Sequence, residues 1–511
     1  MATTALFRSM AVLWAMCGCL AGQPDSSTAR PRSIRKDQPI IDLASAAAVL
    51  PPELAADGLI QLAHSEAPSD KKLAVAWLED AFRLAKQATF PYRVVTLSGI
   101  AATSDSTAGI VQLSLEPGLD ALSLRSRSIR EMLRFDRQKA REMFDEITSV
   151  VPPPLTCTSA TGFSLSLYYT TALAIERDGF SPMERSRGLV QDFVRGLVSR
   201  IGSPFQLLPL QQTLVLEASH ARDADEVLTS YAIAVGNLRT DDRSFTATTT
   251  PALFQSLHEL VAACRSRGAS PAPMLNAFRQ YFERQLAQEQ CRDNLSAGTD
   301  QSILRVVQSL NDLLAAFTPD QPAVRLDNTR PAQPSDKADI TLFWDSPSTK
   351  QLLARLRHLR FGDGESGAVS TSRLKDGRTP YLGVADRSTS SWTGELQDFL
   401  EAFSQWQAQS EEPPQVKFHE AADIYENLIE LIPISNAARS NLLDEYIAFL
   451  KSSSVEASSP PEWLLHLKRL LQGRDAPDRS AILARVKAQG DSAMTFYVEF
   501  EDLVNKGLIV K

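Results

Sequence analysis

The chain has 511 residues, more than one hydrophobic core usually serves, so its length predicts several domains or an array built from repeats. Hydrophobic residues make up 43% of the sequence, which is ordinary for a globular protein, and the formal net charge is −8. An acidic chain repels phosphate backbones, and this argues against nucleic acid as the principal partner.

Residues 1 to 22 have the pattern of a secretory signal peptide. Arg8 precedes an apolar run over residues 10 to 20, which is too short to span a bilayer. A second interpretation is bacterial lipoprotein processing, because residues 16 to 19 resemble a lipobox in which Cys19 would be acylated. We therefore expect an exported protein, periplasmic or extracellular, without a transmembrane span. Cys19 would tether it to the membrane if the second interpretation holds.

Residues 23 to 49 begin with a polar stretch that cannot bury enough apolar surface to fold alone, so we expect a disordered tether there. From Pro51 onward, apolar residues recur at intervals of three and four, which is typical of amphipathic helices. This pattern defines a predicted N-terminal helical domain over residues 50 to 318. Helix starts are predicted near residues 51, 70, 91, 117, 136, 155, 182, 204, 223, 251, 271 and 299. Their mean separation is about 22 residues, so a helix pair spans about 45 residues, which is similar to the period of HEAT-type repeats.

A run of arginines is the charge pattern that most favours binding. The four arginines are spaced four, three and four residues apart, and they are Arg130, Arg134, Arg137 and Arg141. On one continuous helix they would form a stripe able to bind carboxylates, phosphates or lipid head groups. Two alternatives remain open. Asp136 could cap a new helix and split the stripe, or the arginines could form a solvated face partly paired with nearby acids such as Glu131 and Glu142.

Three cysteines follow the predicted leader, in a compartment that favours oxidation. Cys264 lies in an apolar run and is expected to be a buried free thiol. In successive antiparallel helices, Cys264 and Cys291 would be separated by roughly 20 Å, too far for a disulfide. Cys157 and Cys291 fall on the same edge of the predicted helix array. A disulfide between them is predicted only if the N-terminal helices curl into a compact arrangement.

The second half of the chain is predicted to form another helical domain. Residues 319 to 340 are rich in proline and poor in apolar residues, which indicates a linker before a C-terminal helical domain over residues 341 to 511. Residues 362 to 391 are predicted to be a flexible insertion. Within it Glu365 precedes Ser366, an order similar to that at the catalytic glutamate of lytic transglycosylases. A Gly-Asp-Gly turn before Glu365 favours a solvent-exposed loop instead of an enclosed acid.

The clearest helix pair lies between residues 418 and 450. Four positions in its first helix and the turn after it are spaced four, three and five residues apart, and they are Ala421, Tyr425, Leu428 and Pro433. This spacing resembles the second helix of a tetratricopeptide repeat, over about one repeat, and the resemblance implies an antiparallel helix pair. The acidic face of the first helix is expected in water, and it comprises Glu420, Asp423, Glu426 and Glu430.

No catalytic, cofactor-binding or metal-binding motif is recognised in the sequence. The six histidines show no pair at metal-ligand spacing and are expected at the surface or at helix ends. We expect an all-α protein of about 18 helices, stacked as antiparallel pairs in an α-solenoid or a curled α-α superhelix. Such an array favours a binding or scaffolding module of the cell envelope with a protein or peptide partner. The alternative is an envelope hydrolase, for example a glycan-cleaving one, with a dispersed active site.

Overall fold

The protein is all-α, as predicted. A computed structural model describes residues 38–65, 70–88, 94–96, 118–148, 150–152, 154, 159–161, 165–220, 224–239, 245, 251–287, 296–325, 347–361, 389–409, 414–452, 463–472 and 476–507. These ranges contain twenty α-helices, one 3-10 helix and one sheet of two short strands. The fold class is therefore confirmed, whereas regular stacking of the helix pairs stays a prediction.

The N-terminal half is a succession of short helices. They are α1 (Gln38–Ala47), α2 (Pro52–His64), α3 (Lys71–Ala85), α5 (Ala121–Met132), α6 (Arg137–Asp145), α7 (Leu165–Asp178), α8 (Pro182–Ser186), α9 (Leu189–Ser199), η1 (Pro204–Gln206), α10 (Leu207–His220), α11 (Ala224–Gly236), α13 (Pro251–Ser266), α14 (Ala272–Leu286) and α15 (Ser296–Phe317). The starts predicted near 51, 70, 136, 182, 204, 223, 251 and 271 agree with observed starts to within one residue. Local caps contribute to this agreement, because Ser181 forms a capping box with Glu184, and the side chain of Gln206 accepts a hydrogen bond from the backbone N–H of Ser203.

Two of the predicted helices are wrong. Where helices were expected from residues 91 and 155, the structure has strands β1 (Val94–Thr96) and β2 (Ser159–Thr161). The strands pair antiparallel, with Val94 opposite Thr161. The β-branched residues of β1 suit a strand, but the pairing partner lies more than sixty residues away in sequence. Periodicity within one window cannot detect such a partner.

The predicted tether is wrong for residues 38–47, which form α1. Its buried side chains, Ile40, Leu43, Ala44 and Ala47, lie on one face. That face packs on α2 and on the last helix of the chain, α22 (Ser492–Asn505). A segment too polar to fold alone is thus ordered by an apolar surface that comes from the opposite end of the sequence.

The C-terminal half begins with α16 (Pro347–Phe361), and its remaining helices are α17 (Thr389–Gln409), α18 (Pro414–Leu431), α19 (Ala437–Ser452), α20 (Trp463–Leu471), α21 (Ala476–Gln489) and α22. The helix pair predicted over residues 418 to 450 is confirmed as α18 and α19.

In the predicted linker, Val324 is buried and its backbone N–H donates to Asn311 of α15 at 2.8 Å. Helix α17 begins three residues inside the predicted insertion, and residues 362–388 lie outside the described ranges.

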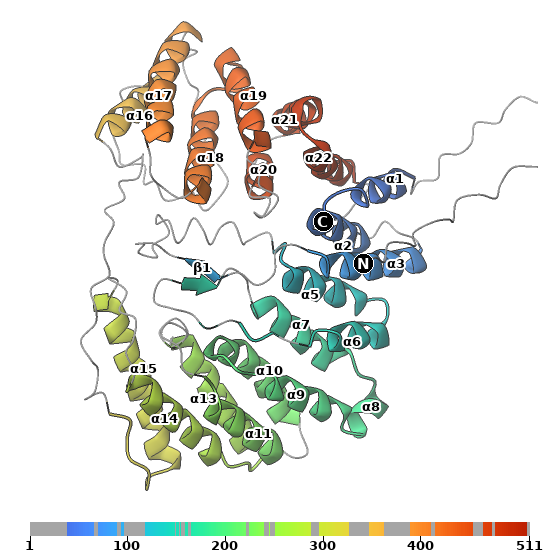
Figure 1. Ribbon diagram of the computed structural model, residues 1–511, viewed down its shortest axis with the longest axis vertical. Coiled ribbons are helices and arrows are strands. Elements are labelled where there is room, and N and C mark those ends of the chain that lie inside the picture. The colour runs from blue at the N-terminus through green and yellow to red at the C-terminus, as the bar shows by residue number, and fades with distance from the viewer. Residues whose placement is uncertain are drawn as a thin grey trace, which may run out of the picture.

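Figure 1 shows α22 beside α1 and α2, so the C-terminal helices extend the row of N-terminal helices from its first member. A buried polar contact ties this junction together. The Tyr497 hydroxyl donates to Asp57 Oδ2 at 2.6 Å, and Arg127 of α5 lies 2.6 Å from Asp57 Oδ1. Residues at the two ends of the sequence therefore share one core.

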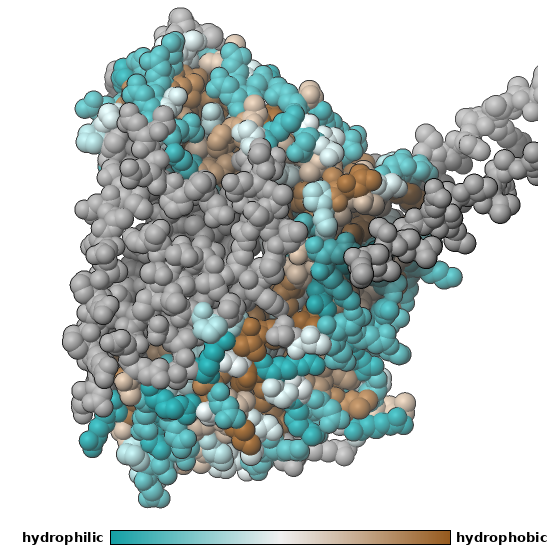
Figure 2. All heavy atoms as spheres, viewed as in Figure 1, coloured by the Kyte–Doolittle hydropathy of each residue, from teal (hydrophilic) through white to brown (hydrophobic). Residues whose placement is uncertain are grey.

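Hydrophilic side chains cover much of the outer helices on the face drawn in Figure 2, and apolar ones gather where helices meet. None of the helices that the structure describes has the length and apolar character needed to cross a membrane.

Candidate anion-binding surface

The predicted arginine stripe is divided by a helix break. Helix α5 ends at Met132, and α6 begins at Arg137 after Asp136, whose carboxylate accepts a hydrogen bond from the backbone N–H of Lys139 at 2.9 Å. This is an ordinary N-cap, which satisfies one of the free N–H groups of the first turn. The alternative in which Asp136 starts a new helix is therefore confirmed, and no continuous stripe forms.

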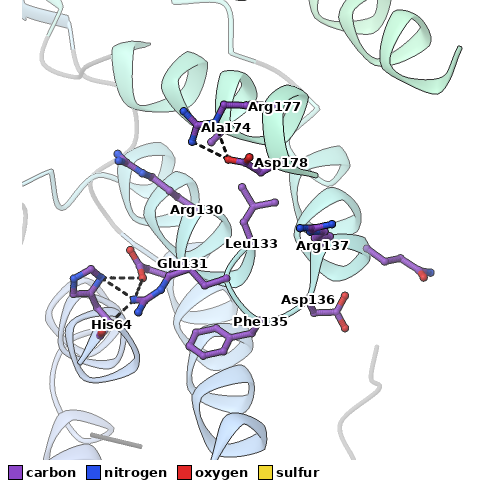
Figure 3. A pocket seen from close by; sticks show the side chains of 12 residues that line it. His64, Arg130, Glu131, Leu133, Phe135, Asp136, Arg137, Ala174, Arg177 and Asp178 are labelled. Atoms are coloured by element: carbon purple, nitrogen blue, oxygen red, sulfur yellow. Dashed lines mark hydrogen bonds and ion pairs between the residues drawn. The ribbon is translucent and has the colours of Figure 1, made fainter. Parts of the chain in front are cut away.

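The break nevertheless brings three of the four arginines around one hollow. Arg130, Arg134 and Arg137 line a cavity of about 900 Å³ at the junction of α5 and α6. Arg177 enters it from α7, and His64 enters from the end of α2 (Figure 3). We call this site the arginine hollow. The sequence did not indicate Arg177, because it is separated from the arginine run by more than thirty residues.

Arg141 points to a different neighbour. Its guanidinium lies 2.6 Å from Glu184 of α8 and stacks over the Phe180 ring, 4.6 Å from the ring centroid. The hydrogen bond from Arg141, with those from Ser181, lowers the pKa of Glu184 to about 2. Arg141 therefore connects α6 to α8 and does not belong to the arginine hollow.

Two of the hollow's arginines are already paired. Arg134 lies 2.9 Å from Glu131 and donates to the His64 backbone carbonyl at 3.1 Å. Arg177 pairs with Asp178 at 2.8 Å. The expected pairing of the arginines with nearby acids is thus confirmed for Arg134 and Glu131.

Arg130 and Arg137 are exposed, and neither forms a hydrogen bond or an ion pair with another residue in the described part of the chain. Arg130 lies in the last turn of α5, where the helix dipole favours a cation. Arg137 is the first residue of α6, where the dipole disfavours one. The charge of Arg137 is therefore not explained by helix stability, and both guanidinium groups can accept an anion from outside the molecule.

The predicted cysteine sites are only partly described. Cys264 is buried and free, as expected, and burial raises the pKa of its thiol to about 12. Cys157, Cys291 and Cys19 lie outside the described residues, so the disulfide and the lipid anchor stay predictions. Glu365 also lies outside them.

The expected positions of two histidines and of the acidic face of α18 are wrong. His419 and His466 are both buried, and Glu420 is buried as well. Asp423 and Glu426 are half-buried, and only Glu430 is exposed on that face. The reason is that α20 covers this face with His466 and Arg469, which contact Glu426 and Asp423. This cluster could not be predicted from the sequence, because its members lie on two helices about forty residues apart and match no known motif.

No protein-family model matches the chain, no curated protein matches it, and no solved structure matches it.

Proposed function

We propose that the protein is an exported binding module that holds an acidic protein or peptide partner at the arginine hollow. The observation that carries this proposal is the pair of exposed guanidinium groups of Arg130 and Arg137, which have no partner among the described residues and line the same cavity. Export is supported by the leader-like pattern of residues 1 to 22.

Carboxylates suit this hollow better than uncharged groups do. A guanidinium offers a planar fork of donors that matches the two oxygens of a carboxylate. The hollow also has apolar side chains from Leu133 and Phe135, which can pack against the aliphatic part of a glutamate or aspartate. Because the cavity is open to solvent, the expected affinity is modest and depends on salt.

The test is the binding of a fluorescent oligoglutamate peptide, measured by anisotropy at low and at physiological salt. We expect the double variant Arg130→Glu with Arg137→Glu to bind at least about tenfold more weakly, equivalent to about 1.4 kcal/mol. Arg137→Glu places a carboxylate in the first turn of α6, where the helix dipole favours it. Arg130→Glu places a carboxylate in the last turn of α5, where the dipole disfavours it, so circular dichroism with thermal melting must show that the double variant is folded before a loss of binding is assigned to the hollow.

The matched control is Arg305→Glu with Arg325→Glu, which changes the net charge equally at two exposed arginines on and just after α15. Affinity equal to that of the unmodified protein is expected. If the control loses as much affinity as the test variant, the binding is general charge attraction and the hollow is not the site. An intact Met1 in protein purified from its native source would contradict export.

A further inference from the structure

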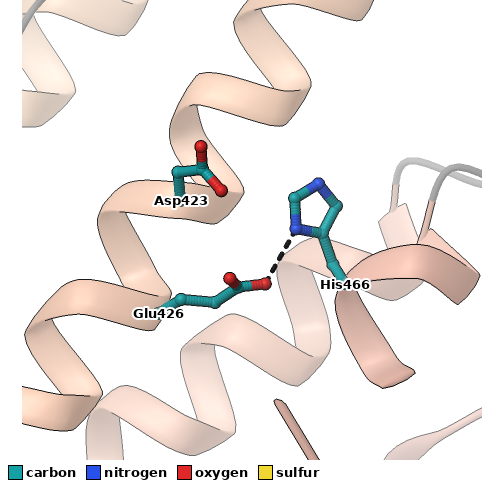
Figure 4. Close-up of side chains that lie close together, drawn as sticks. All are labelled: Asp423, Glu426 and His466. Carbon is teal, nitrogen blue, oxygen red and sulfur yellow. Dashed lines mark hydrogen bonds and ion pairs between the residues drawn. The ribbon is translucent and has the colours of Figure 1, made fainter. Parts of the chain in front are cut away.

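Three side chains with metal-ligating atoms converge between α18 and α20. Asp423 and Glu426 are three residues apart on α18 and therefore lie on one face of it, and His466 projects from α20 toward both (Figure 4). One ligand atom from each lies within 4.8 Å of the other two. The site is separate from the arginine hollow, which is built by α2, α5, α6 and α7.

The ring of His466 is oriented by contacts on both of its nitrogens. Its Nδ1 lies 2.8 Å from Glu426 Oε1, and its Nε2 lies 2.8 Å from Nδ1 of the buried His419. In one of the two neutral tautomers of His466 the proton is on Nε2, and this N–H donates a hydrogen bond to Nδ1 of His419. Nδ1 then directs a lone pair at the carboxylates.

In that tautomer three acceptors face one another. A cation is the group that satisfies all three together, since a single proton can bridge only two. The carboxylates are also held in place from outside. The Tyr446 hydroxyl donates to Glu426 Oε1 at 2.9 Å, and Arg469 lies 3.3 Å from Asp423 Oδ1. Outer partners of this kind orient the ligands in metal sites.

We propose that His466 Nδ1 and the carboxylates of Asp423 and Glu426 bind one divalent transition metal ion of the zinc class. One imidazole with two carboxylates is a nitrogen and oxygen donor set that suits such ions, and three protein ligands leave one position for water. Zinc ligands at about 2.1 Å in a tetrahedron are about 3.4 Å apart. On binding, the 2.8 Å distance between Glu426 and His466 would have to lengthen by about half an ångström. The longer distances between ligand atoms, which are up to 4.8 Å, would have to shorten. Rotation of the side chains can produce both changes.

The experiment titrates chelator-treated protein with Zn²⁺ against a competing indicator dye. We expect one ion per chain. Asp423→Asn and Glu426→Gln each preserve side-chain shape while removing a charged donor, and each should weaken binding about tenfold or more. Glu430→Gln is the matched control, because Glu430 lies one turn beyond Glu426 on the same helix and is exposed. It should bind as the unmodified protein does.

Co²⁺ replaces Zn²⁺ in a second measurement, where visible d–d bands without a thiolate charge-transfer band are expected from this donor set. The proposal is overturned if no ion binds, if both variants keep full affinity, or if a thiolate band shows that cysteine is the ligand. Circular dichroism with thermal melting confirms that each variant is folded. If Glu426→Gln fails to fold, Asp423→Asn decides the question by itself, because the Asp423 side chain is 37% exposed whereas that of Glu426 is only 16% exposed.

Discussion

Cys264 shows how burial sets the chemistry of a single residue. The side chain is fully buried in α13, and burial raises the pKa of the thiol to about 12, so almost none of it is thiolate at neutral pH. We expect iodoacetamide at pH 8 to leave Cys264 unmodified in the folded protein and to modify it after unfolding. Peptide mapping by mass spectrometry measures this directly. Rapid labelling of native Cys264 would contradict its burial.

The same map, made without reductant, tests the predicted disulfide. A linked peptide pair containing Cys157 and Cys291 would support both the bond and the compact arrangement that it requires. If Cys157 and Cys291 are both alkylated as free thiols, the predicted disulfide is wrong. The prediction that Cys264 is protected by burial does not depend on this result.

At the scale of one element, α2 is shaped by a close approach to α22. A Cβ added to Gly58 would lie 2.6 Å from Cζ of the buried Phe496, closer than side-chain carbons normally come. In α9, a Cβ added to Gly196 would meet nothing within 4 Å. Glycine at position 58 is therefore required by packing, whereas glycine at position 196 only lowers helix propensity.

The two glycines allow a matched test. Gly196→Ala should raise the free energy of unfolding by about 0.5–1 kcal/mol, because alanine loses less backbone entropy in a helix. Gly58→Ala has the same intrinsic gain but overpacks the core at a typical cost of about 1–3 kcal/mol, so we expect a net loss. Urea denaturation of both variants gives the comparison. Equal stabilisation by the two substitutions would show that α2 and α22 do not pack as described.

At the scale of the whole molecule, Asp57 joins helices from the two ends of the chain. Burial by itself would raise the pKa of its carboxyl, but the charges of Arg127 and Lys468 and the hydrogen bond from Tyr497 outweigh burial and lower it below 3.8. A carboxyl whose pKa is lower in the folded state contributes stability above its unfolded pKa. That contribution is lost as pH falls through the folded value.

We therefore expect Asp57→Asn to lower the free energy of unfolding by about 3 kcal/mol at pH 7, because it leaves Arg127 without its buried partner. The difference from the unmodified protein should begin to shrink below about pH 4, where Asp57 of the unfolded chain becomes protonated, and should be lost as pH falls through the lower pKa of the folded state. Denaturant titrations between pH 3 and pH 7 measure both effects. Tyr497→Phe, which removes only the 2.6 Å hydrogen bond, should show a smaller loss. A constant difference at every pH would contradict a lowered pKa for the Asp57 carboxyl.

Local patterns in the sequence account for the all-α class and for most helix starts, because periodicity and caps depend on residues within about four positions of each other. Asp136 and Ser181 are caps of this kind, and both could be predicted. The four arginines were also found in the sequence, but as a stripe. Only the break at Asp136 and the approach of α7 made three of them part of a hollow with Arg177.

Everything that joins distant parts of the chain depends on tertiary packing. The pairing of β1 with β2, the ordering of α1 against α22, and the contact of His466 with Glu426 each involve residues forty or more positions apart. A helix face that reads as solvated is buried as soon as another helix supplies partners for its polar groups, as α20 does for Glu426. Local patterns specify which residues can be buried, whereas the partner that buries them depends on how the whole chain packs.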